Sequence, residues 1–455
     1  MSKFKAISPI DSRYYKDNDI REICSYESQI MSKIYSEFEW FLFLCKTNGF
    51  VPDLVQLNEL LTGLYGNFEN FDIIERTTKH DIKAVEYYIK CLVEKSKFYT
   101  SKSDEERSKI LSYIHFGLTS QDIVSLSSNI LFSKISYELI QNMKNSVDLL
   151  FEIFGKNPVL MVGFTHGQPA VPIESKLIYD NYKERILTLI DKIYSVEPKV
   201  KFGGAIGNNS SMKLVGVTNI DELMNNFVFG FRIPTPKFSI TFSRSKNTTQ
   251  VDNWIYLVDL LKEYLQLSSI YVDLCRDLWH YCSIGYICQS KDNGQIGSST
   301  MVQKTNPINF ENCEGIMEKL ESDFSFYIKK LSKSRLQRDL SDSVVIRMVF
   351  ESFAMFDVAI DSLLKGLIKS SLNEEFITSE LDNHYEMSAE YLQLFMKSKG
   401  LANSYEIILN LLKDVKLTDK LSYRIFVSKL YNESVISKDI YDELIKFNIN
   451  DYKKV

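Results

Sequence analysis

The sequence predicts an all-α protein built around a bundle of long helices. Three observations support this fold class: long stretches of the chain lack proline, they carry apolar residues at helical spacing, and alternating patterns typical of strands are rare. No proline lies between Pro236 and Pro307, and none follows Pro307. Because proline interrupts a helix, these stretches can form helices of unusual length.

Three segments are the expected long helices. Residues 253–290 are apolar around most of the helical circumference, and residues 173–197 and 342–372 share that pattern. A helix as long as the first would span about 57 Å, which exceeds the core of one compact domain. We therefore expect a bundle shared between subunits. Asn306-Pro307 resembles a cap followed by a proline in the first turn of a further helix.

The chain divides into three expected regions. They are an N-terminal helical region (1–112), a central long-helix bundle (113–365) and a smaller C-terminal helical region (366–455). Residues 202–209 (FGGAIGNN) form the main irregular segment. Their glycine spacing differs from the dinucleotide-binding motif, and no strand is predicted before them, so we expect no nucleotide cofactor there.

Composition excludes several classes of function. The net charge of -5 gives no basic excess that would draw the chain to nucleic acid. No run of about 18 apolar residues predicts a membrane span, and the N-terminus does not resemble a secretory signal. The seven cysteines are scattered and odd in number, so we expect reduced thiols and a cytosolic protein.

Five histidines are the candidates for proton transfer. His166 is expected in a loop, because glycine and proline follow it in THGQPA. His80 should lie at a helix start, with Thr77 or Thr78 as the cap. For each, a purely structural role stays open on local grounds.

The other three histidines are expected to be structural. His115 precedes Thr119 and Ser120, which can cap the helix that contains Asp122. His280 lies near Cys275, Cys282 and Cys288, but the seven-residue spacing of Cys275 and Cys282 does not match a zinc site. We therefore expect these cysteines and His280 in the core, and His384 in a structural role.

Two further segments carry polar groups suited to anions. Residues 334–347 contain Arg335, Arg338 and Arg347, whose guanidinium groups match phosphate geometry. A helix end joined by salt bridges to Asp339 and Asp342 is the alternative. Residues 297–307 (GSSTMVQKTNP) combine small residues, several of which carry hydroxyl groups, with one lysine. This composition predicts either a helix-breaking loop or a lid that closes over an anion.

These motifs together resemble one family. GSSTMVQKTNPINFEN is similar to the signature loop of the fumarase/aspartase superfamily. The adenylosuccinate lyase family within it is indicated by motifs in the family's order between about residue 6 and residue 395: SPIDSRY (8–14), HDIKAVEYY (80–88), TSQD (119–122), THGQPA (165–170), TTQ (248–250) and RDLSDS (338–343).

The resemblance implies a homotetramer in which three subunits build each active site. It implies elimination of fumarate from adenylosuccinate to give AMP, and the same cleavage of the succinylated aminoimidazole carboxamide ribotide (SAICAR) to AICAR. No metal or organic cofactor is implied. An argininosuccinate-type lyase is one alternative, disfavoured because its substrate lacks a phosphate; a non-catalytic scaffold of the same fold is another.

The resemblance also assigns residues. Ser298 is the implied general base, His166 the general acid, His80 a substrate-positioning group and Lys304 the cation that makes the serine basic. The implied substrate-binding residues are Arg13, Tyr14, Lys79, His80, Asp81, Thr119, Ser120, Gln250, Ser298, Ser299, Lys304, Thr305, Asn306, Asn312, Arg338, Ser343, Val344, Val345, Ile346 and Arg347.

The sequence departs from the family pattern in two places. Val302 and Gln303 stand where the family usually has proline and often histidine, which predicts a more flexible open loop. Lys79 stands where relatives often have asparagine, and it adds a cation beside His80. Neither change removes a reacting group.

Overall fold

The computed structural model describes residues 5–65, 68–234, 239–290, 301 and 304–454. The chain forms two compact units, each assembled from separate segments: residues 1–143, 188–269 and 315–360 make the first, and residues 144–187, 270–314 and 361–455 the second. The all-α fold class is confirmed. The division into three contiguous regions stays a prediction.

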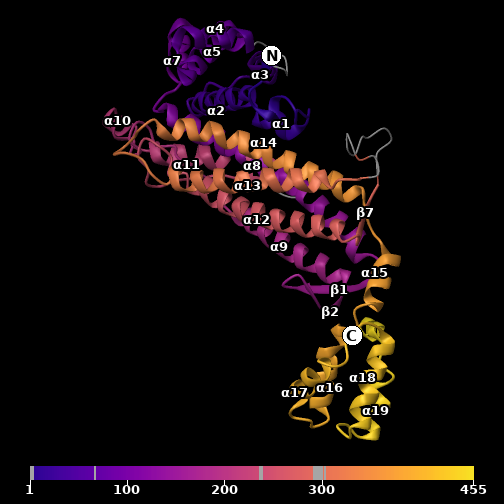
Figure 1. Cartoon of the computed structure of the whole chain (residues 1–455). Helices are drawn as coiled ribbons and strands as arrows, with labels where there is room; N and C mark the ends of the chain where they lie inside the picture. The colour runs from indigo at the N-terminus through magenta and orange to yellow at the C-terminus, as the bar shows by residue number, and fades with distance from the viewer. Residues whose placement is uncertain (1–4, 66–67, 235–238, 291–300, 302–303, 455) are drawn as a thin grey trace. The chain divides into compact units, whose positions relative to one another are not determined.

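Long helices contribute residues to both units (Figure 1). They are α8 (Ser120–Leu150), α9 (Ser175–Ser195), α12 (Ile255–Ser283), α13 (Ile308–Leu331) and α14 (Ser341–Ile368). Within the first unit these helices pack through aromatic rings. The Phe132 ring of α8 stacks on Phe350 of α14 with centroids 4.7 Å apart, and the Tyr264 ring of α12 lies 4.9 Å from that of Phe353.

The expected helix over 253–290 is too long. Helix α12 ends at Ser283, so it spans about 43 Å rather than 57 Å. Gly285 follows with φ +83°, the left-handed conformation that commonly terminates a helix. The chain then enters β7 (Ile287–Gln289), which pairs antiparallel with β8 (Ser370–Leu372), and this strand also shortens the helix expected over 342–372.

The first unit adds shorter helices around a core that contains Trp40. The Trp40 ring lies 5.3 Å from Phe202 and 5.0 Å from Phe227. These helices are α1 (Asp19–Cys24), α2 (Tyr26–Thr47), α3 (Leu54–Tyr65), α4 (Phe68–Thr78), α5 (Asp81–Lys95), α6 (Lys97–Thr100), α7 (Asp104–Ser112), α10 (Ser210–Leu214) and α11 (Ile220–Gly230). Short strands pair here as well: β3 (Lys199–Val200) with β6 (Ser243–Arg244), and β4 (Arg232–Pro234) with β5 (Ser239–Thr241).

The second unit contains a hairpin that the sequence analysis did not predict. Strand β1 (Leu160–Thr165) pairs antiparallel with β2 (Gln168–Glu174), and His166-Gly167 is the two-residue turn. Both turn residues have positive φ, +54° and +72°, as the tight turns of hairpins require. The unit ends with α15 (Glu374–Asp382), α16 (Ser388–Ser398), α17 (Ser404–Leu412), α18 (Lys420–Asn432) and α19 (Lys438–Leu444).

A helix that crosses a membrane must be both long and predominantly apolar. Across the described residues, no helix combines the length and the apolar character needed to cross a membrane. Helices α8 and α12 exceed the required length, but both carry several charged residues.

Candidate active site

The first unit contains a pocket of about 580 Å³ between α2, α4, α5, α8 and α14. Residues far apart in sequence meet there, since it draws on segments near 30, 80, 120 and 340. The predicted site residues that line it are Lys79, His80, Asp81, Ser120, Arg338, Ser343, Val344, Ile346 and Arg347. Nine of the implied substrate-binding residues are therefore brought together.

His80 is held by the helix that it begins. It is the N-cap of α5, and its Nδ1 accepts the backbone N–H of Lys83 at 3.2 Å. Because Nδ1 is an acceptor here, the ring proton of the neutral imidazole lies on Nε2. The expected caps, Thr77 and Thr78, instead end α4. The side chain is 53% exposed, so Nε2 is free to meet a ligand in the pocket.

Asp81 offsets part of the positive charge in this pocket. Lys33 of α2 donates to Asp81 Oδ2 at 2.7 Å, and Arg347 Nη2 lies 3.6 Å from the same oxygen. Burial alone would raise the pKa of Asp81, but the charge and hydrogen bond of Lys33, the Ile82 N–H and the Arg347 charge hold that pKa below its usual value. Asp81 is therefore a carboxylate that fixes two cations.

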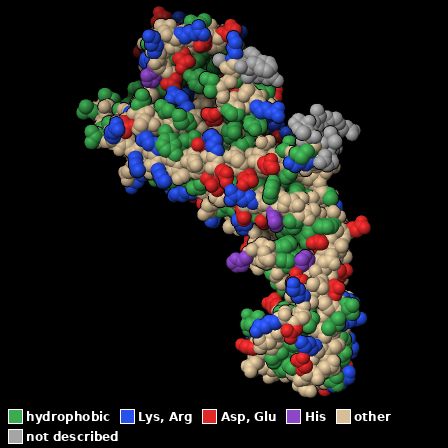
Figure 2. Space-filling view, viewed as in Figure 1, with side chains coloured by type: hydrophobic (Ala, Val, Ile, Leu, Met, Phe, Trp, Pro, Cys, Tyr) green, Lys and Arg blue, Asp and Glu red, His purple; other side chains and the backbone are tan. Residues whose placement is uncertain are grey.

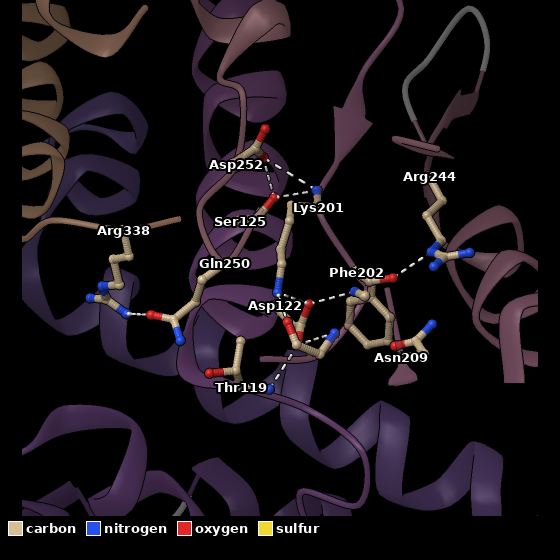
Figure 3. A network of polar contacts seen from close by, with 12 residues as sticks. Thr119, Asp122, Ser125, Lys201, Phe202, Asn209, Arg244, Gln250, Asp252 and Arg338 are labelled. Atoms are coloured by element: carbon tan, nitrogen blue, oxygen red, sulfur yellow. Dashed lines mark hydrogen bonds and ion pairs between the residues drawn. The ribbon is translucent and has the colours of Figure 1, made fainter. Parts of the chain in front are cut away.

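The arginines come from the turn before α14 and from the first turns of α14 itself. Arg338 Nη1 donates to Gln250 Oε1 at 3.1 Å (Figure 3). Arg347 Nη1 donates to the Ser343 carbonyl at 2.9 Å. Asp339 accepts backbone N–H groups of Arg335 and Ser341. These contacts differ from the salt-bridged helix end that was the alternative, and they leave guanidinium donors for an anion.

Thr119 and Ser120 begin α8, as predicted from their capping pattern. The Thr119 N–H donates to Asp122 Oδ2 at 2.7 Å, and the Asp122 N–H donates to the Thr119 carbonyl at 2.9 Å. Asp122 also accepts the N–H groups of Gly203 and Gly204 (Figure 3). The glycine-rich segment is therefore bound to a carboxylate and to the helix start beside the pocket.

His115 is a buried partner of two carboxylates. Its Nδ1 lies 2.8 Å from Glu37 Oε2, its backbone N–H donates to Glu37 Oε1 at 2.7 Å, and its Nε2 lies 3.8 Å from Glu86 Oε1. Burial alone would lower the pKa of His115, but the hydrogen bond and charge of Glu37, with the charges of Glu86 and Asp122, raise it. The ion pair fixes the loop that leads to Thr119.

Other predicted residues belong to the second unit or to the rest of the first. His166 is exposed at the tip of the β1–β2 hairpin, Lys304 and Thr305 are exposed, Asn306 is half-buried and Asn312 is exposed on α13. Among the described residues of the first unit, the predicted residues that do not line the pocket are Arg13, Tyr14, Thr119, Gln250 and the buried Val345. Ser298, Ser299, Val302 and Gln303 lie outside the described residues.

Comparison with known proteins decides the family. A profile described as Lyase matches residues 56–320, and one described as Adenylosuccinate lyase C-terminal matches residues 334–453. An adenylosuccinate lyase of Dictyostelium discoideum is 34% identical over 90% of this chain and 88% of its own length. One of Haemophilus influenzae is 31% identical over 94% of this chain and 93% of its own. The chain belongs to the adenylosuccinate lyase family.

Solved structures agree on the fold of this family member. The fumarate lyase from Mesorhizobium sp. BNC1 superposes with a TM-score of 0.69 at 12% identity, covering 95% of this chain and 96% of that one. A β-carboxy-cis,cis-muconate cycloisomerase from Acinetobacter calcoaceticus sp. ADP1 gives 0.70 at 14% identity, with 96% of each chain covered. At these identities the likeness concerns the fold alone.

The adenylosuccinate lyase pocket also has residues that the sequence analysis missed. Lys33 and Trp254 line it, and the Trp254 Nε1 lies 3.4 Å from Asp342 Oδ2. The sequence could have pointed to Lys33, because this lysine and Glu37 are charged residues among the apolar residues of α2. In the structure the Lys33 side chain is only 9% exposed. No sequence pattern pointed to Trp254, since this residue belongs to an irregular segment just before α12.

Two interior assignments in this family member are wrong. His280, expected in the interior, is exposed on α12, as is Cys288 on β7, whereas Cys275 is buried as expected. The reason is that α12 has a solvent-exposed face near its C-terminal end, which carries the polar side chains of Asp273, Arg276 and His280 at helical spacing.

Proposed function

We propose that this lyase cleaves adenylosuccinate to AMP and fumarate, and that it also converts SAICAR to AICAR, in purine biosynthesis. The observation that carries the proposal is the pocket of the first unit, which gathers Lys79, His80, Arg338, Ser343 and Arg347. Guanidinium, ammonium and hydroxyl groups on one wall suit a phosphorylated, multiply anionic substrate. On the face shown in Figure 2, other Lys and Arg side chains are interspersed with acidic ones.

The proposed chemistry needs a base and an acid. Ser298, as an alkoxide, takes the proton from the carbon beside a succinyl carboxylate; the carbon–nitrogen bond then breaks, and His166 gives a proton to the departing nitrogen. Lys304 lowers the cost of the serine alkoxide and of the negative charge that develops on the carboxylate. His80 orients the substrate through Nε2. Atoms balance, because fumarate and AMP together contain every atom of the substrate.

Two groups of residues are proposed to hold the substrate ends. The succinyl carboxylates and neighbouring groups are assigned to Thr119, Ser120, Gln250, Ser299, Lys304 and Asn306. The phosphate and nucleotide are assigned to Arg13, Tyr14, Arg338, Ser343 and Arg347. Further proposed substrate-binding residues are Lys79, Asp81, Thr305, Asn312, Val344, Val345 and Ile346. The bond between Gln250 and Arg338 supports this assignment, because it joins one residue of each group.

We also propose a homotetramer with active sites shared by three subunits. Large apolar side chains are exposed on the long helices of the first unit, among them Ile255, Phe326, Val344 and Met348. Exposed apolar groups of this kind on bundle helices favour an interface between copies of the chain. A cytosolic location remains a prediction.

The reaction is tested by following fumarate release from purified protein. We expect release from adenylosuccinate and from SAICAR, and none from argininosuccinate, which lacks the phosphate that the arginines would bind. Release from argininosuccinate alone would replace the proposed substrate, and no release from any of the three would favour a non-catalytic scaffold.

The proposed base has its own test. Ser298→Ala should reduce turnover of adenylosuccinate by at least about 10³-fold, because alanine has no hydroxyl to take the carbon-bound proton. AMP binding, measured by calorimetry, should stay within about threefold of the wild-type value, since the arginines are unchanged. Turnover near the wild-type rate would show that another residue is the base.

A further inference from the structure

Lys201 is a buried cation in the first unit that the proposed reaction does not use. Its side chain is fully buried, and its Nζ donates to Asp122 Oδ1 at 2.6 Å and to the Gly204 carbonyl at 2.7 Å (Figure 3). Burial lowers the pKa of Lys201, although the charge and the hydrogen bond of Asp122 act to raise it. A buried ion pair rarely stabilises a fold more than apolar residues of similar volume would, so its presence calls for another role.

The Asp122 side of this pair reaches one substrate-binding segment. The same carboxylate accepts the Thr119 N–H at 2.7 Å, and the N–H groups of Gly203 and Gly204 at 2.7 and 3.1 Å. It therefore joins the first residues of α8 to the glycine-rich loop. Lys201 is the cation that contacts this carboxylate directly, at 2.6 Å.

The backbone of Lys201 reaches the other segment. Its N–H donates to Ser125 Oγ at 2.8 Å and lies 3.3 Å from Asp252 Oδ2, and the Ser125 hydroxyl donates to the same Asp252 oxygen. Asp252 in turn accepts the Trp254 N–H at 2.9 Å. Asp252 is two residues from Gln250, so the network holds the segment that bears this glutamine.

The glycine-rich loop touches that segment directly. Gly207, with φ +83°, lies so close to Thr248 that an added Cβ would be 2.2 Å from the Thr248 carbonyl oxygen. Only glycine permits this approach and this φ. Lys201 thus lies where the α8 start, the loop and residues 248–254 meet.

We propose that Lys201 is a positioning residue for the lyase reaction, an inference that rests on the proposed function. It contacts no substrate. Instead, its ammonium and its backbone fix the spacing between Thr119-Ser120 and Gln250, the groups assigned to the succinyl carboxylates. Misplacement of such groups by about 1 Å can cost about 10²-fold in rate. Arg347 of α14 contacts Asp81 and the Ser343 carbonyl instead, and Arg338 meets the network only through its side-chain bond to Gln250.

The test compares Lys201→Met with a matched control. Lys213→Met removes a lysine that also pairs with an aspartate, Asp221, at 2.6 Å, but in an exposed pair. We expect Lys201→Met to lower kcat/KM for adenylosuccinate at least about tenfold, while the Kd for AMP, which lacks the succinyl group, changes less than about threefold. The control should match wild type in both.

A double variant separates positioning from stability. Lys201→Met leaves Asp122 buried without its cation, so thermal stability falls too; adding Asp122→Asn removes that charge and should restore much of the stability. If kcat/KM stays low while the melting temperature recovers, the positioning role is supported. If kcat/KM recovers with stability, or if folded Lys201→Met keeps the wild-type kcat/KM, the role is overturned.

A milder variant decides the question if Lys201→Met does not fold. Ser125→Ala removes only the hydroxyl that links the Lys201 backbone to Asp252. A severalfold fall in kcat/KM with unchanged AMP binding supports the proposal, and a wild-type kcat/KM overturns it. Wild-type protein that releases no fumarate rejects the proposed function and this inference together, whereas active wild type with unaffected variants rejects the inference alone.

Discussion

The two ring nitrogens of His80 have different tasks. Nδ1 accepts the Lys83 N–H and so stabilises the start of α5, while Nε2 carries the proton that a substrate can meet. A single substitution can remove one task and keep the other. Asparagine places an acceptor near the position of Nδ1, and glutamine places a donor near that of Nε2.

The two variants should therefore show opposite losses. His80→Asn should keep stability and lose activity, whereas His80→Gln should lose stability and keep more activity. His80→Asn should keep the cap, with stability within about 0.5 kcal/mol of wild type, and lose at least about tenfold in kcat/KM. His80→Gln should lose the cap, at a cost of about 1 kcal/mol, and retain more activity than His80→Asn. Thermal unfolding and fumarate release measure the two effects. Greater activity in His80→Asn would show that Nε2 does not meet the substrate.

His115 predicts a pH-dependent contribution to stability. Its pKa is raised in the folded state, above the value of about 6.5 expected when unfolded. The stabilisation from its contacts with Glu37 and Glu86, and from the charge of Asp122, is then fully present below the unfolded pKa, and it is lost as pH rises through the folded pKa. His115→Gln should thus be destabilised by about 2 kcal/mol near pH 5.5 and by less near pH 9.

Urea unfolding of wild type and His115→Gln at both pH values checks this sign. Glu37→Gln should abolish the pH dependence of the difference, because the fully buried Glu37 makes the shortest contact with the ring. A difference that grows with pH would mean that the folded protein holds His115 neutral.

At the residue scale, local sequence predicts helix caps better than long-range partners. Thr119 and Ser120 begin α8 because their pattern acts within one turn. Lys33 and Asp81, by contrast, lie on different helices and meet only through packing, so no pattern in either segment predicts the pair. The same reason hides the contact between Lys201 and Asp122.

At the element scale, the long helices were predictable and their ends were less so. Helix α9 covers Ser175–Ser195, within two residues of the expected 173–197, because no glycine or proline interrupts its apolar pattern. Helix α12 ends early because a single glycine, Gly285, adopts positive φ. Helix α13 begins at Ile308, one residue after Pro307, so Asn306 precedes the cap rather than forming it.

The hairpin that carries His166 gives a prediction about an element. Gly167 has φ +72°, and no heavy atom lies within 4 Å of the position of an added Cβ, so Gly167→Ala introduces backbone strain without a clash. We expect a loss of about 1 kcal/mol and a lower kcat, because the turn that presents His166 would shift. Thermal unfolding and fumarate release measure both effects.

Gly230→Ala is the matched control for this turn. It also meets open space, but Gly230 ends α11 without positive φ, so stability should stay within about 0.5 kcal/mol of wild type. Equal melting temperatures for Gly167→Ala and wild type would show that the turn accommodates a side chain and that its geometry is not strained.

At the scale of the whole molecule, only the family resemblance could join the separate parts of the site. Residues near 30, 80, 120 and 340 meet in one pocket because helices distant in sequence pack together, and composition or periodicity carries no information on that pairing. The proposed base and acid come from still other segments. Whether they act together therefore depends on the proposed assembly.

Sharing of active sites between subunits predicts complementation between two inactive variants. If Ser298 and His166 of one site come from different subunits, a hybrid tetramer of Ser298→Ala and His166→Gln chains contains some sites with both groups intact. Random mixing of equal amounts after joint unfolding and refolding should restore about a quarter of the wild-type activity, since each group is intact with a chance of about one half. Each variant refolded alone is the control. If the mixture stays as inactive as those controls while size measurements show a tetramer, both groups come from one chain, and the proposed sharing of base and acid between subunits is wrong.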